Sequence, residues 1–331
     1  MKRMLLQITN KNNLQVIILS LFCVLTITLL LYHQTYRITQ TSCSEKAESA
    51  LSFQANIIEG NIKKTQMLTG QLKNIVESKI PYSKIKENPD LIEKYKQALR
   101  PLILSTIKSF NAKTGWVVFD TNIIENAGIV SYYSVGETYI LEKEYDVHKD
   151  NYSNEAWWVD TLNNGYTWTL PYYWEPWKTQ IISFSQTAFS NSIPIAAVGS
   201  ELYYKDIEDS LSSAKLFDNA PIILINEQNI ILFDPLKENI GKVFSEVYPE
   251  SYSVVKKAEA SKPSEVIDTS TKFEHSLLAY HRLSNNWILI SAPNTNSFFT
   301  QIELLSLNII IIILAFLFFV ISIYFFKFII K

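Results

Sequence analysis

The sequence has few cysteines and histidines and almost no net charge. Its 331 residues include two cysteines, four histidines and a formal net charge of -2. With Cys23 and Cys43 as the only thiols, no disulfide framework is available and the chain must fold on its hydrophobic core. The histidines are scattered and no cysteine or aspartate pair has metal-ligand spacing, so we expect no metal and no cofactor. The basic residues are spread out, which argues against nucleic acid as a partner.

Motifs of enzymes are also missing. The sequence contains no phosphate-binding loop and no nucleophile motif. Carboxylates such as Asp120 and Glu125 are the only material for acid-base chemistry, and nothing in the sequence places them together. We therefore expect no catalytic residues and a protein that is not an enzyme. An extracytoplasmic enzyme is the alternative from a different class, and turnover by the protein would support it.

The sequence does contain two long apolar stretches without charge, at 14–32 and 304–326. Each can cross about 30 Å of hydrocarbon as a helix. Lysine and arginine occur in the tails 1–13 and 327–331, and positive residues prefer the cytoplasmic side. The sequence thus predicts a two-pass protein of the inner (plasma) membrane, with cytoplasmic tails and residues 33–303 periplasmic or extracellular. A cleaved signal peptide is the alternative at the N-terminus, although its apolar core is normally shorter.

The segment 33–80 predicts a long stalk helix. It contains no proline, and apolar residues such as Leu51, Ile58 and Leu72 recur at helical spacing along one face. This stripe packs either against a sheet of the same chain or against a second stalk, and we expect a homodimer through this helix. Cys43 lies where two stalks could meet, so an intermolecular disulfide and an unpaired thiol are both open.

Two sets of short β-branched and aromatic runs follow the stalk, bounded by Gly, Asn and Pro. They predict a first lobe at 81–217, with strands at 115–120, 129–133, 167–173, 180–185 and 195–198 and helices at 91–110 and 203–216. A smaller second lobe at 218–300 is predicted with strands at 221–226, 230–233, 265–268, 276–281 and 287–290 and a helix at 244–260. The order of strands and helices in each lobe is that of a PAS-like sensory module. The predicted fold class is α+β: a long N-terminal stalk helix with two PAS-like antiparallel-sheet lobes, flanked by two transmembrane helices.

Four motifs in this order resemble the double Cache sensor domains of bacterial chemoreceptors, histidine kinases and diguanylate cyclases. They are Glu155-Ala-Trp-Trp-Val-Asp160, Gly165-Tyr-Thr-Trp-Thr-Leu-Pro-Tyr172, Val198-Gly-Ser-Glu-Leu202, and Ile222 to Asp234 with Asn239-Ile-Gly241. The resemblance covers residues 33–300. It implies a ligand pocket in a membrane-distal first lobe and a membrane-proximal second lobe, often without ligand.

In the amino-acid-sensing branch of that family, an arginine before an aromatic pair binds the ligand carboxylate and an aspartate after a glycine takes the ammonium. The corresponding residues here are Glu155 and Glu201. A glutamate at the arginine position would repel a carboxylate, so we expect a small cationic, amine-type metabolite, with another small metabolite as the alternative. The expected ligand-binding residues are Tyr152, Glu155, Trp157, Trp158, Tyr172 and Glu201.

The expected function is therefore a membrane-anchored extracytoplasmic small-molecule sensor. Family members normally continue past the second span into a signalling region, and this sequence stops about where such a region begins. Three explanations stay open: a truncated chemoreceptor, kinase or cyclase; a stand-alone sensor acting through a separate cytoplasmic or membrane partner; and a tethered binding protein.

Overall fold

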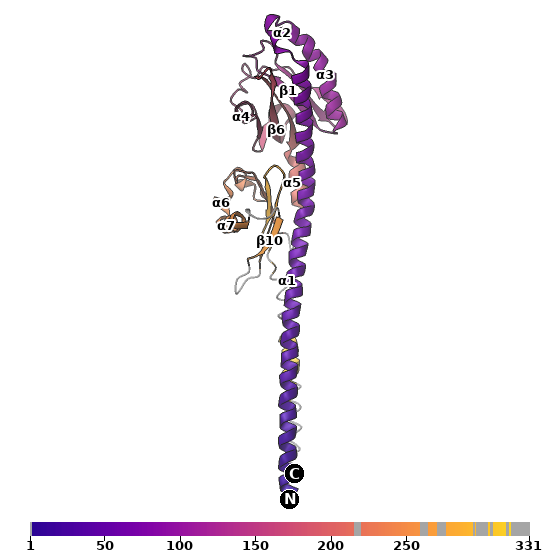
Figure 1. The fold of residues 1–331 in the computed structure, drawn as a ribbon, viewed down its shortest axis with the longest axis vertical. Coiled ribbons are helices and arrows are strands. Elements are labelled where there is room, and N and C mark those ends of the chain that lie inside the picture. The colour runs from indigo at the N-terminus through magenta and orange to yellow at the C-terminus, as the bar shows by residue number, and fades with distance from the viewer. Residues whose placement is uncertain are drawn as a thin grey trace.

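The computed structural model describes residues 2–214, 220–258, 264–269, 276–293, 295, 304, 307–315 and 318. At 2–18, 20, 21, 257 and 258 it describes the backbone alone. One helix, α1 (Lys2–Lys79), forms the long axis of the molecule. Two antiparallel sheets pack against it, the first near its C-terminal end and the second closer to the N-terminus (Figure 1). The expected α+β architecture with a long N-terminal helix and two sheet lobes is confirmed.

Helix α1 is continuous because no proline occurs before Pro81, whose ring disfavours helical backbone in the residue ahead of it. Within the described part of the chain, no helix is both long and apolar enough to cross a membrane. Most of the predicted span 304–326, and the tail 327–331, lie outside the described residues.

The first lobe has a seven-stranded sheet of order β3-β2-β1-β7-β6-β4, with β5 paired to β6. Two helices, α2 (Tyr82–Glu87) and α3 (Leu91–Ser109), lead into it from α1. Its remaining elements are β1 (Thr114–Phe119), β2 (Ile129–Val135), β3 (Thr138–Leu141), α4 (Ala156–Asn164), β4 (Tyr166–Trp168), β5 (Tyr172–Trp174), the 3-10 turn η1 (Glu175–Trp177), β6 (Thr179–Ser190), β7 (Ile193–Tyr203) and α5 (Tyr204–Ser213).

The second lobe has a five-stranded sheet of order β10-β11-β12-β8-β9. Its elements are β8 (Ile222–Ile225), β9 (Ile231–Phe233), η2 (Lys237–Asn239), α6 (Phe244–Val247), α7 (Pro249–Ala258), β10 (Ser264–Asp268), β11 (Leu277–Arg282) and β12 (Ile288–Ser291). A buried carboxylate, Asp234, organises the turn after β9. It accepts hydrogen bonds from the Tyr248 hydroxyl at 2.8 Å and the Asn239 amide at 3.0 Å.

Proline divides two elements that the sequence predicted as single ones. The run at 167–173 forms β4 and β5, which separate around Pro171, and the helix expected from Phe244 forms α6 and α7, which separate at Pro249. Proline lacks the N–H that a ladder or a helix interior requires. The short, largely exposed strand β3 was not expected.

The apolar stripe of α1 packs against the lobes of the same chain. Leu51, Ile58 and Leu72 are at most 1% exposed and belong to cores that also contain residues of both sheets. The same stripe therefore cannot also pack against a second stalk. This corrects the reason for expecting a homodimer through α1. The homodimer itself stays a prediction. Cys43 is free and buried, and burial raises the pKa of its thiol.

Candidate ligand-binding cavity

Both faces of the first sheet are buried where β1 crosses it. Successive side chains of a strand point to opposite faces, so neighbouring residues of β1 enter different cores. On β1, Val117 and Phe119 join the core formed with α1 and α3. Trp116 and Val118 face the other way and join a cluster with Trp157 of α4. The face that α4 covers carries the aromatic residues, and a cavity lies there.

Ten residues line this cavity, and it encloses about 20 Å³, enough for about one water molecule. The ten include six aromatic residues, two aliphatic residues and two glutamates, and none is a lysine, arginine or histidine. The lining consists of Trp116, Ile129, Glu142, Tyr145, Trp157, Tyr172, Trp174, Trp177, Ile181 and Glu201.

Glu201 of β7 is the buried acid at one side of the cavity, with 8% of its surface exposed. One carboxylate oxygen accepts a hydrogen bond from the Trp116 indole N–H and the other from the Thr114 hydroxyl. The Ser183 hydroxyl lies 3.5 Å from the first oxygen. Burial raises the pKa of Glu201 to about 7, because loss of hydration outweighs these donors, and the charge of Glu142 adds to the effect.

A glycine allows Trp116 to reach Glu201. The sheet register pairs Trp116 with Gly199 on β7. A Cβ atom at position 199 would lie 2.3 Å from the Trp116 ring and 2.7 Å from the Phe184 carbonyl oxygen, so only glycine lets the indole lie against β7. The ring lies against the sheet beside Glu201 and edge-on to Trp157, with centroids 5.4 Å apart.

Glu142 is the second acid of the cavity. It follows β3, and its backbone N–H donates to the Ser131 carbonyl oxygen at 2.9 Å, which extends the pairing of β3 with β2. Burial raises the pKa of the Glu142 carboxyl, and the polar groups of Ser131, Trp174 and Trp177 offset part of that effect. Among the residues that the structure describes, the Glu142 Oε1 atom accepts no hydrogen bond, and the buried indole N–H groups of Trp157, Trp174 and Trp177 likewise have no partner.

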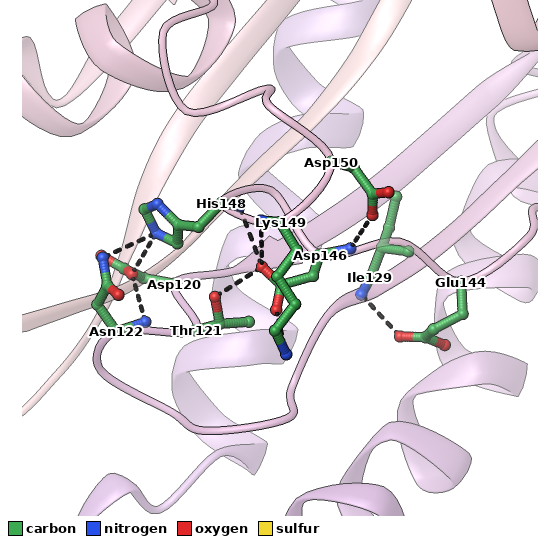
Figure 2. A network of polar contacts seen from close by, with 9 residues as sticks. All are labelled: Asp120, Thr121, Asn122, Ile129, Glu144, Asp146, His148, Lys149 and Asp150. Carbon is green, nitrogen blue, oxygen red and sulfur yellow. Dashed lines mark hydrogen bonds and ion pairs between the residues drawn. The ribbon is translucent and has the colours of Figure 1, made fainter.

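Polar contacts hold the residues that follow Glu142, from Glu144 to Asp150 (Figure 2). Asp146 accepts a hydrogen bond from the Thr121 hydroxyl at 2.9 Å, and His148 Nε2 lies 3.0 Å from Asp120 Oδ1. Upstream, Glu144 accepts the Ile129 N–H at 2.9 Å and pairs with the buried Lys96 ammonium at 2.5 Å. The loop after β3 is thus attached on both sides of Tyr145.

Three of the six residues expected from the sequence line the cavity: Trp157, Tyr172 and Glu201. The Tyr172 hydroxyl is within 2.8 Å of the Ser183 hydroxyl, which itself approaches Glu201. Burial, together with the negative charge of Glu201, raises the pKa of the Tyr172 phenol, so this group stays neutral. These side chains come from α4, β5 and β7, and the sheet brings them together.

The other three expected residues lie outside the lining. Tyr152 packs behind it, with its ring 5.2 Å from that of Trp174. Trp158 is buried outside the lining, with its ring edge-on to His148 at 5.8 Å and to Trp157 at 6.1 Å. Glu155 is the exposed residue ahead of α4, and its carbonyl oxygen accepts the first N–H groups of that helix.

A second hollow, of about 590 Å³, lies between α1, the β2–β3 turn and α5. Glu201 also borders it, and two lysines of its lining already have partners. The Lys113 ammonium is 2.7 Å from Asp206, and Lys64 donates to the Asn111 carbonyl oxygen at 2.5 Å. The smaller cavity differs in that its polar atoms include several without partners.

No protein-family model and no curated protein sequence matches the chain. Several solved structures do match its fold. The extracellular domain of soHK1S-Z6, assigned as a histidine kinase, matches with a TM-score of 0.55 at 13% identity, over 82% of this chain and 99% of that one. Methyl-accepting chemotaxis protein X matches with a TM-score of 0.54 at 16% identity, over 77% and 99%. The ligand-binding domain of the Campylobacter jejuni chemoreceptor Tlp3, in complex with 4-methylisoleucine, matches with a TM-score of 0.50 at 14% identity, over 77% and 92%.

The two lobes form a double Cache fold. At these identities the similarity establishes the fold, and the site must be argued from its own residues. The double Cache arrangement places the aromatic cavity in the lobe farther along α1 from the N-terminus (Figure 1). Sequence analysis did not select Trp116, Glu142 or Tyr145 for this site. Glu142 and Tyr145 lie in a charged stretch that looks like an exposed loop, and only the strand pairing brings them to the cavity.

Proposed function

We propose that the protein is a membrane-anchored extracytoplasmic sensor, not an enzyme, and that its first lobe binds a small cationic amine. One observation carries the proposal: the cavity combines aromatic walls with the buried carboxylate of Glu201, the half-buried carboxylate of Glu142 and no basic side chain. An ammonium group near an aromatic face gains about 0.5 to 2 kcal/mol when water is excluded, and a carboxylate adds a charge-assisted hydrogen bond.

The charge of the cavity favours a cation over an amino acid. The Campylobacter jejuni Tlp3 domain, which has a similar fold, was solved with 4-methylisoleucine and with L-norvaline. An α-carboxylate normally requires an arginine or lysine, and the lining here offers neither. Glu142 and Glu201 would repel it. The resemblance and the lining therefore support a sensory site of the same kind with a different ligand class.

Membrane anchoring is supported by the apolar segments 14–32 and 304–326. Large apolar side chains described in the first segment point outward, with Leu19 64% and Phe22 67% exposed. Exposed apolar surface of this extent on a helix needs an apolar environment. The alternative within the same class is a tethered accessory protein, or the input part of a longer chemoreceptor, kinase or cyclase, that acts through a separate signalling partner.

The test is ligand-induced stabilisation of the full-length protein in lipid nanodiscs. Butylamine and tetramethylammonium are larger than the water-sized cavity, so their binding requires its aromatic walls to move apart. They should raise the melting temperature, because a ligand that binds only the native state stabilises it by about 2.7 kcal/mol at a hundredfold excess over Kd. Butyrate should have no effect. Glu201→Gln should reduce the shift, whereas the same substitution at the exposed Glu155 should leave it unchanged. Stabilisation by butyrate and not by amines would refute the cationic site.

A further inference from the structure

We infer that the hairpin at residues 173–180, which we call the flap, is the part of the cavity wall that moves when the cavity opens. The flap consists of the end of β5, the turn η1 and the start of β6, and it contributes Trp174 and Trp177 to the lining. The role of this movement rests on the proposed amine site, because a cavity of about 20 Å³ admits an amine only after one of its walls has moved. The movement itself is measurable without a ligand.

Two other walls of the cavity are held in place by hydrogen bonds. Helix α4, which carries Trp157, is attached to β6. The Ser185 hydroxyl donates to the Trp157 carbonyl oxygen at 3.2 Å. The Thr187 hydroxyl donates to the Thr161 carbonyl oxygen at 2.6 Å. The loop that carries Tyr145 is anchored by the network of Figure 2. Breaking buried hydrogen bonds leaves polar groups without partners, so we expect α4 and this loop to stay where they are.

The flap, in contrast, projects beyond the sheet. Strand β5 pairs with β6 at three positions, and at Ile181 alone among these β7 pairs with the other side of β6. Tyr203 is the last residue of β7, and the chain turns there into α5. The pairs at Thr179 and Gln180 therefore form a ribbon of two strands with no third strand beside it. A two-stranded hairpin is only marginally stable by itself.

Bending is confined to the root of the flap, because the chain on both sides of it is attached to the sheet. Ahead of the flap, the Thr169 N–H donates to the Ser183 carbonyl oxygen at 3.0 Å, and the Ser183 N–H donates to the Thr169 hydroxyl at 2.9 Å. Pro171 follows and has no N–H with which to continue a ladder. After the flap, β6 enters the sheet at Ile181.

Ring packing holds the flap against the cavity. Trp177 stacks on Tyr133 of β2, with ring centroids 5.5 Å apart. Trp174 lies 5.2 Å from Tyr152 and edge-on to Trp157 at 6.4 Å. Within the described part of the chain the two flap indole N–H groups are buried without a partner, and water would supply one in an open position. The closed position therefore depends on aromatic contacts, and loss of the Trp177 ring should release the flap.

The experiment measures two distances between nitroxide labels by pulsed electron paramagnetic resonance, on the full-length protein in nanodiscs with both native cysteines replaced by alanine. One label is placed at Asn163 of α4. The other is placed at Glu175 in the flap or at Lys149 in the anchored loop, and all three positions are exposed. Because the flap packs against α4 through Trp157, opening should lengthen the distance from 163 to 175 and leave that from 163 to 149 unchanged.

Two variants of the hairpin are compared without ligand. Trp177→Leu should shift the distance from 163 to 175 to longer values. Tyr173→Leu should not, because it removes an aromatic ring of the same hairpin that is 51% exposed and lies outside the lining. An unchanged distance in Trp177→Leu, or a shift of the loop label in place of the flap label, would overturn the inference.

Hydrogen exchange of the wild type keeps the inference testable if Trp177→Leu fails to fold. Without ligand, amides of the flap should exchange about tenfold or more faster than those of the anchored loop at 144–150, and equal rates would overturn the inference. Butylamine should lengthen the distance from 163 to 175 in the wild type. If butylamine changes nothing, the proposed amine site fails, whereas the ligand-free measurements decide on the flap.

Discussion

The buried acid Glu201 should make the stability of this protein depend on pH in a way that one substitution removes. Burial raises its pKa from 4.5 to about 7 in the folded protein. The native state thus keeps the proton to a higher pH than the unfolded chain does. Glu201 stabilises the fold fully below pH 4.5, and this contribution is lost as pH rises through 7. At about 1.36 kcal/mol per pH unit, the loss is about 3 kcal/mol.

Glu201→Gln tests this reasoning, because an amide keeps the shape and cannot ionise. The free energy of unfolding would be measured by urea titration at several pH values between about 4.5 and 8.5, with tryptophan fluorescence as the signal. At pH 4.5 both side chains are neutral, so the amide replaces a protonated carboxyl beside the same partners, Thr114 and Trp116. As pH rises from 4.5 to 8.5, the free energy of unfolding of the variant should increase by about 3 kcal/mol relative to that of the wild type.

Subtracting the unfolding free energy of the wild type from that of the variant cancels the contribution of every other titrating group. These groups include His281, whose pKa is lowered by burial and which therefore acts in the opposite direction. Glu155→Gln, at an exposed site, provides a matched control whose difference from wild type should not depend on pH in this range. A difference between Glu201→Gln and wild type that stays constant from pH 5 to pH 8.5 would refute the reasoning.

Three further predictions concern other parts of the chain. Gly199→Ala should cost about 1 to 3 kcal/mol in urea unfolding and weaken amine binding, because the new methyl group displaces the Trp116 ring; unchanged affinity would contradict the assigned role of that ring. Tyr248→Phe should cost about 1.5 to 3 kcal/mol, because it removes a hydrogen bond to the buried Asp234, and should leave amine affinity unchanged. A topology reporter inserted between residues 261 and 264 should read as extracytoplasmic, and a cytoplasmic signal would contradict the two-pass arrangement.

Local sequence pattern was sufficient for most of the fold. The absence of proline before Pro81 and the regular apolar stripe predicted α1, and β-branched runs predicted strands such as β8 and β12. Where the predicted strands and helices differ from those of the structure, local chemistry explains the difference. Proline interrupts the backbone hydrogen bonding of a helix or a ladder, and the exposed β3 has no buried face to produce an alternating pattern.

The cavity could be predicted only in part, because its members are joined by strand pairing and not by sequence spacing. Tyr172 and Glu201 lie in short motifs that resemble a known family, so the sequence pointed to them. Glu142 occurs in the charged run Leu141-Glu-Lys-Glu-Tyr145, a pattern typical of solvated loops. Its place in the lining follows from the pairing of β3 with β2 and from the aromatic side chains around the cavity, neither of which a single sequence reveals.

The position of Glu201 in β7 also links the cavity to the stalk. The next residue, Leu202, points to the opposite face of the sheet and belongs to the core that contains Leu51 of α1. Strand β7 then continues directly into α5, where the Ser210 hydroxyl donates to Gln54 of α1 at 2.9 Å. A ligand can shift a conformational equilibrium only through an interaction that differs between the two states. Displacement of the Glu201 proton by a bound cation supplies such a difference, at the strand that joins the cavity to the stalk.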